Sequence, residues 1–344
     1  MGKFSQKRMD KWKKESYNKK LLKRGDGSML YDIGSFIHDL RMERGYSQEE
    51  LCYGICSTGN LSKIENGIRM PNQRTIEALL QRLGCEEIIL QFSTKEELQR
   101  RKLCGEIIRK LSKGDKKGGE EIVKELEETI AEEDILSSQY CRFARAILHQ
   151  IEGQSPRKII KELEGALRVT KPNYKSGEEK IKGLLTYNEI VIIANIANNY
   201  AEGGDNERAL NILLGLKEYM ETHVLDEREL VRKYQMVIFD ISNVLLSEER
   251  YDEAIELCDI GIRRGKENNR LRLFPYFLAN KGFALLGNGE EEQAYRQLQK
   301  SYHMWDAMDN EEECERLVHY LKENWNFNRP LQQCKMQKKK ENQH

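Results

Sequence analysis

The stretch SQEELCYGICSTGNLSKIENGIRMP, residues 47–71, carries the clearest signals for the fold of the N-terminal part of the chain. Ser47 is followed three residues later by Glu50, which is the spacing of a capping box at the start of a helix. Leu51 and Ile55 follow at helical spacing and give this helix an apolar face. The sequence therefore predicts that a short helix begins after Ser47.

A second short helix is expected directly after the first. Residues 56–60 are predicted to form the turn, within which Ser57 can act as an N-cap. Leu61 and Ile64 point toward the core at helical spacing, and Gly67 ends the helix. The stretch thus predicts two short helices joined by a tight turn.

Helical patterns flank this pair on both sides. Apolar residues recur at helical spacing over residues 33–40 and again over 76–83. Pro71 and Asn72 are expected to open the following helix, and Gly84 to close it. Four helices with one shared core are therefore predicted.

Residues 33–84 resemble the phage-repressor type of helix-turn-helix that many bacterial regulators carry. The match rests on S-Q-E-E-L and on L-S-K-I-E-N-G-I-R-M-P, nearly residue for residue. The spacing between the two helices is one residue shorter than in the commonest members. This short form resembles the peptide-sensing Rgg/PlcR branch.

The resemblance implies that the second helix of the motif enters the DNA major groove and that the first crosses the backbone. It places the base-reading positions at Thr58, Gly59 and Lys63. Lys63 can donate a hydrogen bond to a guanine, and Gly59, which has no side chain, allows the DNA to approach the helix closely. Other polar side chains are suited to phosphate contacts. These are Gln48, Asn60, Ser62, Asn66 and Arg69. The alternatives are that Gln48 serves only to cap its helix and that Arg69 is a solvated loop charge.

In similar domains, the residues at the positions of Arg41 and Glu65 form a partly buried ion pair between the first and third helices. The resemblance therefore assigns both residues to the fold of the domain and not to DNA contact.

Composition favours an all-α protein, because the 344 residues include only five prolines and no Val/Ile/Thr-rich runs that alternate with period two. Lys and Arg together balance Asp and Glu at 57 each, but unevenly along the chain. Residues 1–30 carry ten Lys/Arg against three Asp/Glu, whereas residues 31–90 carry six against nine. The basic N-terminal arm is either a phosphate-tracking segment or a solvated tail.

Several function classes find no support in the sequence. The eight cysteines show no CxxC spacing, so neither zinc nor another metal or cofactor is expected, and most are interpreted as buried small hydrophobic residues. No catalytic residues are assigned, because there is no Ser-His-Asp set and no phosphate-binding glycine loop. Without an apolar leader or a run of about 20 apolar residues, the protein is expected to be cytoplasmic and not membrane-bound.

Residues 91–325 show a repeating organisation. The small residues Ala209, Ala254 and Ala294 each follow a polar turn, 45 and 40 residues apart. Twelve positions earlier stand Ala197, Ser242 and Gly282. These units resemble degenerate tetratricopeptide repeats, whose usual length is about 34 residues. Two less regular units are expected near 95–132 and 134–170, a capping helix over 311–325, and a polar tail over 326–344.

In such arrays the first helix of each pair lines a concave surface. Counting back from the marker alanines places amides and apolar side chains there, which suit an extended peptide. The predicted peptide-binding residues are Asn195, Asn198, Met236, Phe239, Asn243, Tyr276, Asn280 and Phe283. The alternative is that the asparagines only tolerate a solvated face and that Met236 and Phe239 belong to the core.

The combination of a repressor-type helix-turn-helix with helix-pair repeats resembles the Rgg/PlcR/PrgX/Rap group. The resemblance implies a homodimer that binds operator DNA under the control of a short secreted and re-imported peptide, as in quorum sensing. Two alternatives stay open: a repeat domain that binds a protein partner, and a Rap-like repeat protein that acts on signalling enzymes.

Overall fold

The computed structural model describes residues 32–85, 95–111, 115–128, 130, 134–175, 183–327 and 329–331. Within these residues every regular element is an α-helix, so the predicted all-α fold is confirmed. The basic arm of residues 1–30 and most of the tail of residues 326–344 lie outside the described residues.

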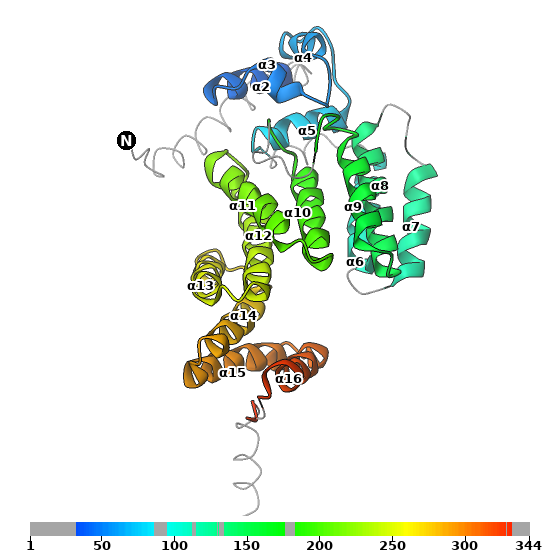
Figure 1. The fold of residues 1–344 in the computed structure, drawn as a ribbon. Coiled ribbons are helices and arrows are strands. Elements are labelled where there is room, and N and C mark those ends of the chain that lie inside the picture. Colours follow the sequence, from blue (N-terminus) through cyan, green and yellow to red (C-terminus); the bar gives the residue numbers. More distant parts are fainter. Residues whose placement is uncertain are drawn as a thin grey trace, which may run out of the picture.

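The N-terminal helices form a compact unit, which we call the head (Figure 1). Its helices are α2 (Asp32–Glu43), α3 (Gln48–Cys52), α4 (Thr58–Glu65) and α5 (Gln73–Arg82). Their shared core includes Ile37, Leu51, Leu61, Leu79 and Leu80, all without exposed surface. The apolar spacing that predicted four helices thus produces one buried cluster.

The turn of the head lies earlier than the sequence pattern predicted. α3 ends at Cys52, so that Ile55 belongs to the turn, and α4 already begins at Thr58. The physical reason is a pair of local signals. Gly54 has a positive φ of 68°, which leaves the helix early, and the Ser57 hydroxyl accepts from the Asn60 N–H at the start of α4.

Antiparallel helix pairs follow the head. The first two pairs are α6 (Lys95–Leu111) with α7 (Lys116–Glu128) and α8 (Ile135–Ile151) with α9 (Pro156–Leu167). The next are α10 (Tyr187–Glu202) with α11 (Asn206–Thr222), α12 (Glu227–Ser247) with α13 (Tyr251–Glu267), and α14 (Phe274–Gly287) with α15 (Glu291–Ala307). α16 (Glu311–Trp325) ends the stack, over the same residues as the predicted capping helix. Figure 1 shows the pairs stacked one after another below the head.

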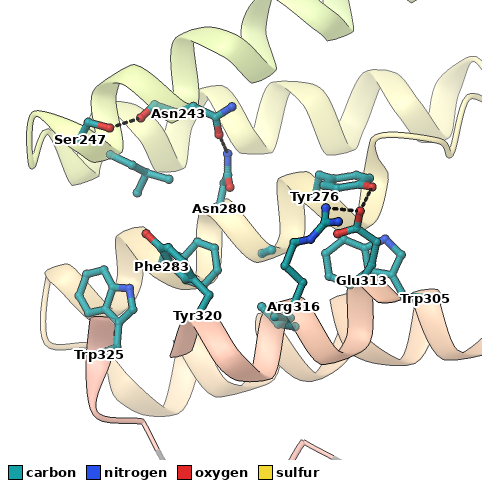
Figure 2. A pocket seen from close by; sticks show the side chains of 13 residues that line it. Asn243, Ser247, Tyr276, Asn280, Phe283, Trp305, Glu313, Arg316, Tyr320 and Trp325 are labelled. Atoms are coloured by element: carbon teal, nitrogen blue, oxygen red, sulfur yellow. Dashed lines mark hydrogen bonds and ion pairs between the residues drawn. The ribbon is translucent and has the colours of Figure 1, made fainter. Parts of the chain in front are cut away.

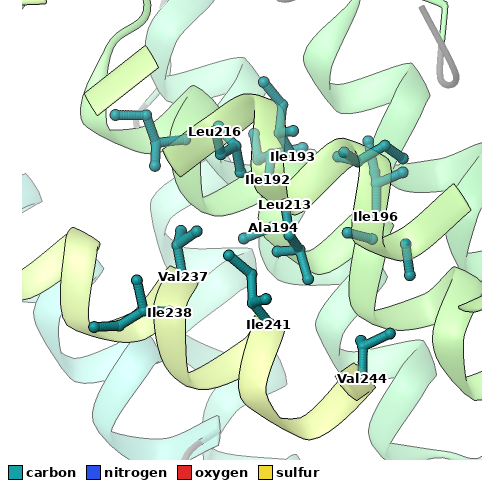
Figure 3. Close-up of a cluster of buried hydrophobic side chains, with 14 of the residues drawn as sticks. Ile192, Ile193, Ala194, Ile196, Leu213, Leu216, Val237, Ile238, Ile241 and Val244 are labelled. Carbon is teal, nitrogen blue, oxygen red and sulfur yellow. The ribbon is translucent and has the colours of Figure 1, made fainter. Parts of the chain in front are cut away.

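The small residues at regular spacing are the places where paired helices touch. Ala209, Ala254 and Ala294 have no exposed surface, and each is the fourth residue of its helix. A Cβ added at Gly282 would lie 2.6 Å from Cγ of Leu298, so glycine permits the close approach of α14 and α15. Branched side chains of α10, α11 and α12, among them Ile193, fill the space between successive pairs (Figure 3).

Most cysteines are buried in the hydrophobic clusters of the head and of the repeats, as predicted. Five are buried and two partly buried, and Cys334 lies outside the described residues. Among the helices that the structure describes, none is long and apolar enough to cross a membrane.

Candidate functional site

One face of α4 is exposed to solvent. Thr58, Gly59 and Lys63 are exposed, while Leu61 and Ile64 on the opposite face are buried in the head. Figure 1 places α4 on the side of the head away from the repeats. The three predicted base-reading positions are therefore all exposed, Thr58 and Gly59 at the N-terminal end of α4 and Lys63 in its last turn.

Gly59 leaves open space on this surface. A Cβ built at this position meets no atom of the described residues within 4 Å. The fold of the head therefore does not require glycine here, which agrees with a role in allowing a partner to approach closely.

The predicted phosphate-contacting side chains differ in their exposure and in the hydrogen bonds that they make within the head. Arg69 donates from Nη1 to Oδ1 of Asn60 at 3.1 Å, and both lie at the solvent edge of the head. Asn66 is exposed and donates to the backbone oxygen of Ser62 at 2.8 Å. Gln48 instead donates from Nε2 to Oε2 of Glu65 at 2.7 Å and so helps to hold the head together.

Arg41 and Glu65 form a two-point ion pair between α2 and α4. Nε of Arg41 lies 2.6 Å from Oε1 of Glu65, and Nη2 lies 2.8 Å from Oε2. Burial alone would raise the pKa of Glu65, but the hydrogen bonds from Arg41, Gln48 and His38 outweigh it and hold the pKa below its usual range. Sequence reasoning missed His38, whose Nδ1 lies 3.2 Å from Oε2 of Glu65.

The head rests on the repeats through the side opposite to the exposed face of α4. The turn between α3 and α4 lies against the end of α9, where a Cβ at Gly54 would lie 1.6 Å from the Thr170 oxygen. Next to it, Asn173 donates to the Tyr53 hydroxyl at 3.0 Å. The end of α5 meets the α11–α12 connection, where a Cβ at Gly84 would lie 2.7 Å from the Val224 oxygen. Backbone thus approaches backbone at two points of this contact.

A buried polar cluster lies between these two points. Nη1 of Arg82 donates to the backbone oxygens of Leu51 and Tyr53, at 3.0 and 2.6 Å, and Nη2 lies 3.4 Å from Oε1 of Glu189. Glu189 also accepts from the Thr170 hydroxyl at 2.6 Å. Burial would raise the pKa of Glu189, but the charges of Arg82 and Lys171 outweigh it and hold it below its usual range. The sequence offered no signal for this cluster.

The predicted groove residues fall into two groups. Four lie on α10 and α12 and are partly buried. Asn195 donates to the Val191 oxygen of its own helix at 2.8 Å, and Asn198 bonds the Asp240 side chain. Met236 and Phe239 pack against the main core cluster. The alternative interpretation, that Met236 and Phe239 belong to the core, therefore holds for the side of each residue that packs against this cluster.

The other four, Asn243, Tyr276, Asn280 and Phe283, line a pocket of about 400 Å³ between α12, α14, α15 and α16 (Figure 2). This volume lies within the range of about 300–1,000 Å³ that ligand pockets usually have. Sequence reasoning missed the contribution of α16, which it interpreted only as a cap. The missed lining residues include Trp305, Glu313, Arg316, Tyr320 and Trp325.

The two ends of the pocket differ in chemistry. At one end, the Tyr276 hydroxyl donates to Oε1 of Glu313 at 2.9 Å, and Nη1 of Arg316 donates to the same oxygen at 2.9 Å. Burial and the bond to Glu313 raise the pKa of Tyr276 to about 12. At the other end, Figure 2 shows Phe283, Tyr320 and Trp325 close together. The pocket is thus polar and paired at one end and aromatic at the other.

Comparison with known proteins gives a match for the head. Residues 37–90 match the helix-turn-helix family HTH_3. The match to a DNA-binding family agrees with the expectation that the chain is not an enzyme. A comparison with curated proteins gives no match.

Among solved structures, the chain resembles Bacillus thuringiensis PlcR. The complex of PlcR with the peptide PapR7 and DNA is 20% identical with a TM-score of 0.52, over 84% of this chain and 99% of that chain. The apo form is 19% identical with a TM-score of 0.53, over 84% of this chain and 98% of that chain. At this identity the resemblance shows a shared fold. Residues 37–90 are therefore a DNA-binding domain of the helix-turn-helix family, carried by a chain that has the fold of PlcR over most of its length.

Proposed function

We propose that this chain is a cytoplasmic transcription regulator that binds operator DNA under the control of a short peptide. Residues 31–90 are the DNA-binding domain, residues 91–325 bind the peptide and form the dimer, and residues 1–30 and 326–344 are terminal segments. The observation that carries the proposal is the presence, in one chain, of an exposed α4 face and of a pocket with unused amide groups.

The amide groups belong to Asn243 and Asn280. Nδ2 of Asn280 donates to Oδ1 of Asn243 at 2.7 Å and to the Ser242 hydroxyl at 2.9 Å. Within the described chain, the Nδ2 group of Asn243 and the Oδ1 atom of Asn280 have no bonding partner. The pair therefore offers one donor and one acceptor side by side, which complements the C=O and N–H of a peptide unit.

The DNA-binding part of the proposal rests on the α4 face. Its N-terminal residues enter the major groove, with Thr58 and Lys63 on base edges and the neighbouring polar side chains on phosphates. The head carries more acidic than basic residues, so a single head gains little from phosphate charge. A homodimer that places two heads on one operator supplies the missing affinity.

The solved PlcR complex contains both a peptide and DNA, which supports the same pair of ligands for this chain. Peptide binding can control DNA binding only if the repeats adopt two conformations, one that favours DNA binding and one that does not, and the peptide has different affinities for them. We propose that the peptide changes the curvature of the repeat stack and so the separation of the two heads.

The test combines DNA and peptide binding. Genomic fragments selected by the purified protein give the operator, and gel shifts with and without synthetic peptides encoded beside the gene measure control. Asn243→Ala is expected to abolish the peptide effect while leaving operator binding intact. If a folded protein partner, and no peptide, alters operator binding, the repeat domain binds proteins and the peptide proposal is wrong.

A further inference from the structure

The aromatic end of the pocket is formed jointly by α14 and α16. The rings of Phe283 and Tyr320 lie 4.8 Å apart between centroids, at an interplanar angle of 56°. Trp325 lies at the same end of the pocket in Figure 2, and Leu246 also lines the pocket. We call these four residues the aromatic subsite. Tyr320 is 44% exposed although its ring is large and apolar, so much of its surface is available for a ligand to cover.

Trp325 carries an unused donor in this subsite. Its Nε1 atom is buried, and no nitrogen or oxygen atom in the described part of the chain bonds to it. Figure 2 shows this nitrogen on the side of the indole ring that faces Phe283 and Tyr320. A buried donor without a partner is unfavourable, so a ligand oxygen that accepts from this N–H, once the indole turns to expose it to the pocket, removes the penalty.

The charges around the pocket indicate what kind of oxygen atom this is. Arg316 donates to Glu312 at 2.6 Å and to Glu313 at 2.9 Å, so its charge is already balanced. The aromatic subsite itself contains no cationic side chain. A ligand carboxylate would lose its hydration there without gaining a counter-charge. The chemistry therefore favours a neutral carbonyl oxygen beside a large apolar side chain.

We propose that the aromatic subsite binds one large apolar residue of the peptide, phenylalanine or leucine in character, while the Trp325 N–H donates to a backbone carbonyl of the same peptide. This inference rests on the proposed function and specifies its ligand. The amide pair of Asn243 and Asn280 holds one peptide unit, and the subsite selects the side chain next to it. α16 is then part of the binding site and not only a cap.

The probe is a set of amidated heptapeptides with alanine at six positions and Phe, Leu, Asp or Lys at the seventh, which is moved along the peptide. Binding is measured by isothermal titration with the full-length protein. At one position, we expect Phe and Leu to bind at least about tenfold more tightly than Asp. Trp325→Phe, which keeps a ring and removes the donor, should weaken the best peptide about tenfold.

Two further variants make the test specific. Tyr320→Ala should reduce the preference for Phe over Asp, and because Tyr320 is an exposed residue outside the buried core, this change leaves the core intact. His319→Ala is the matched control on α16, since this exposed side chain does not line the pocket, and it should bind like the unchanged protein.

The outcomes separate this inference from the proposed function. If no heptapeptide binds at millimolar concentration, both are wrong. If peptides bind and Asn243→Ala weakens them all, yet Asp binds as well as Phe and neither Trp325→Phe nor Tyr320→Ala changes the affinity, the proposed function stands and the aromatic subsite is wrong.

Discussion

Nη2 of Arg82 lies 3.4 Å from Oε1 of Glu189, 107 residues later in the chain, and both side chains are fully buried. The same guanidinium holds the backbone oxygens of Leu51 and Tyr53, at the end of α3. One side chain thus connects the first helix of the helix-turn-helix with the first helix of a repeat. The head and α10 are expected to move as one body, so that changes in the repeats are passed to the position of the head.

Removal of one partner should be strongly destabilising. Glu189→Gln leaves the charge of Arg82 buried without compensation, and breaking a buried pair in this way costs about 3–5 kcal/mol. Arg82→Met, which leaves Glu189 with Lys171 as its remaining charge partner among the described residues, should also be destabilising. The double variant should cost clearly less than the sum of the two. Thermal unfolding and hydrogen exchange of α3 and α5 measure these effects, and additive losses would show that the two residues act independently.

Acid should weaken the head through Glu65. The folded pKa of Glu65 is depressed, so its contribution to stability is present above the unfolded pKa, near 4.5, and is lost as the pH falls through the lower folded value. Glu65→Gln should therefore lower the melting temperature of the head at pH 7 by much more than at pH 3. Calorimetry at both pH values tests this, and an equal decrease at both would contradict it.

Lys63 and Arg69 should affect DNA binding in different ways. Lys63→Ala should weaken operator binding by about 1–3 kcal/mol and have little effect on unrelated DNA, because a base contact is specific. Arg69→Ala should weaken binding to operator and to unrelated DNA equally, and it should reduce the slope of log affinity against log salt concentration by about one. Fluorescence anisotropy over a salt series measures both variants. Lys124→Ala, at an exposed position on α7, is the control, and an unchanged operator affinity in Lys63→Ala would rule out base reading there.

Gly59→Ala should separate folding from DNA binding. Its new methyl group meets open space in the head, and alanine is the better helix former by up to about 1 kcal/mol. The melting temperature should stay the same or rise, whereas operator affinity should fall because the methyl group occupies the approach to DNA. Unchanged affinity would show that the DNA does not come close to this position.

Two helical glycines of the repeats should respond in opposite ways to alanine. At Gly261 an added Cβ would lie 2.5 Å from Cζ of the buried Phe277 ring, so Gly261→Ala should destabilise by about 1–3 kcal/mol. At Gly215 on α11 the added Cβ meets nothing, so Gly215→Ala should be neutral or slightly stabilising. Urea unfolding of both variants tests this, and a stabilised Gly261→Ala would contradict the packing of α13 on α14.

The residues of the head show why local structure was predictable. Ser47 with Glu50, Ser57 and Asn72 are caps that act within three residues, and all three are N-caps in the structure. Cap and apolar-period signals depend on neighbours in the sequence, so they carry over to the fold. The turn between α3 and α4 was predicted three residues too late, because the apolar spacing that continues to Ile55 hides the exit at Gly54, where φ is positive.

Residue spacing was enough to predict the helices, the order of the repeats and the exposed face of α4, because each depends on neighbours within a few turns of chain. The Arg82–Glu189 contact, the packing of the head on the repeats, and the pocket to which Tyr320 and Trp325 contribute are visible only in the folded chain. These features join residues that lie tens to more than a hundred positions apart. Their geometry follows from how successive helix pairs rotate on one another, and no local pattern in the sequence records that rotation.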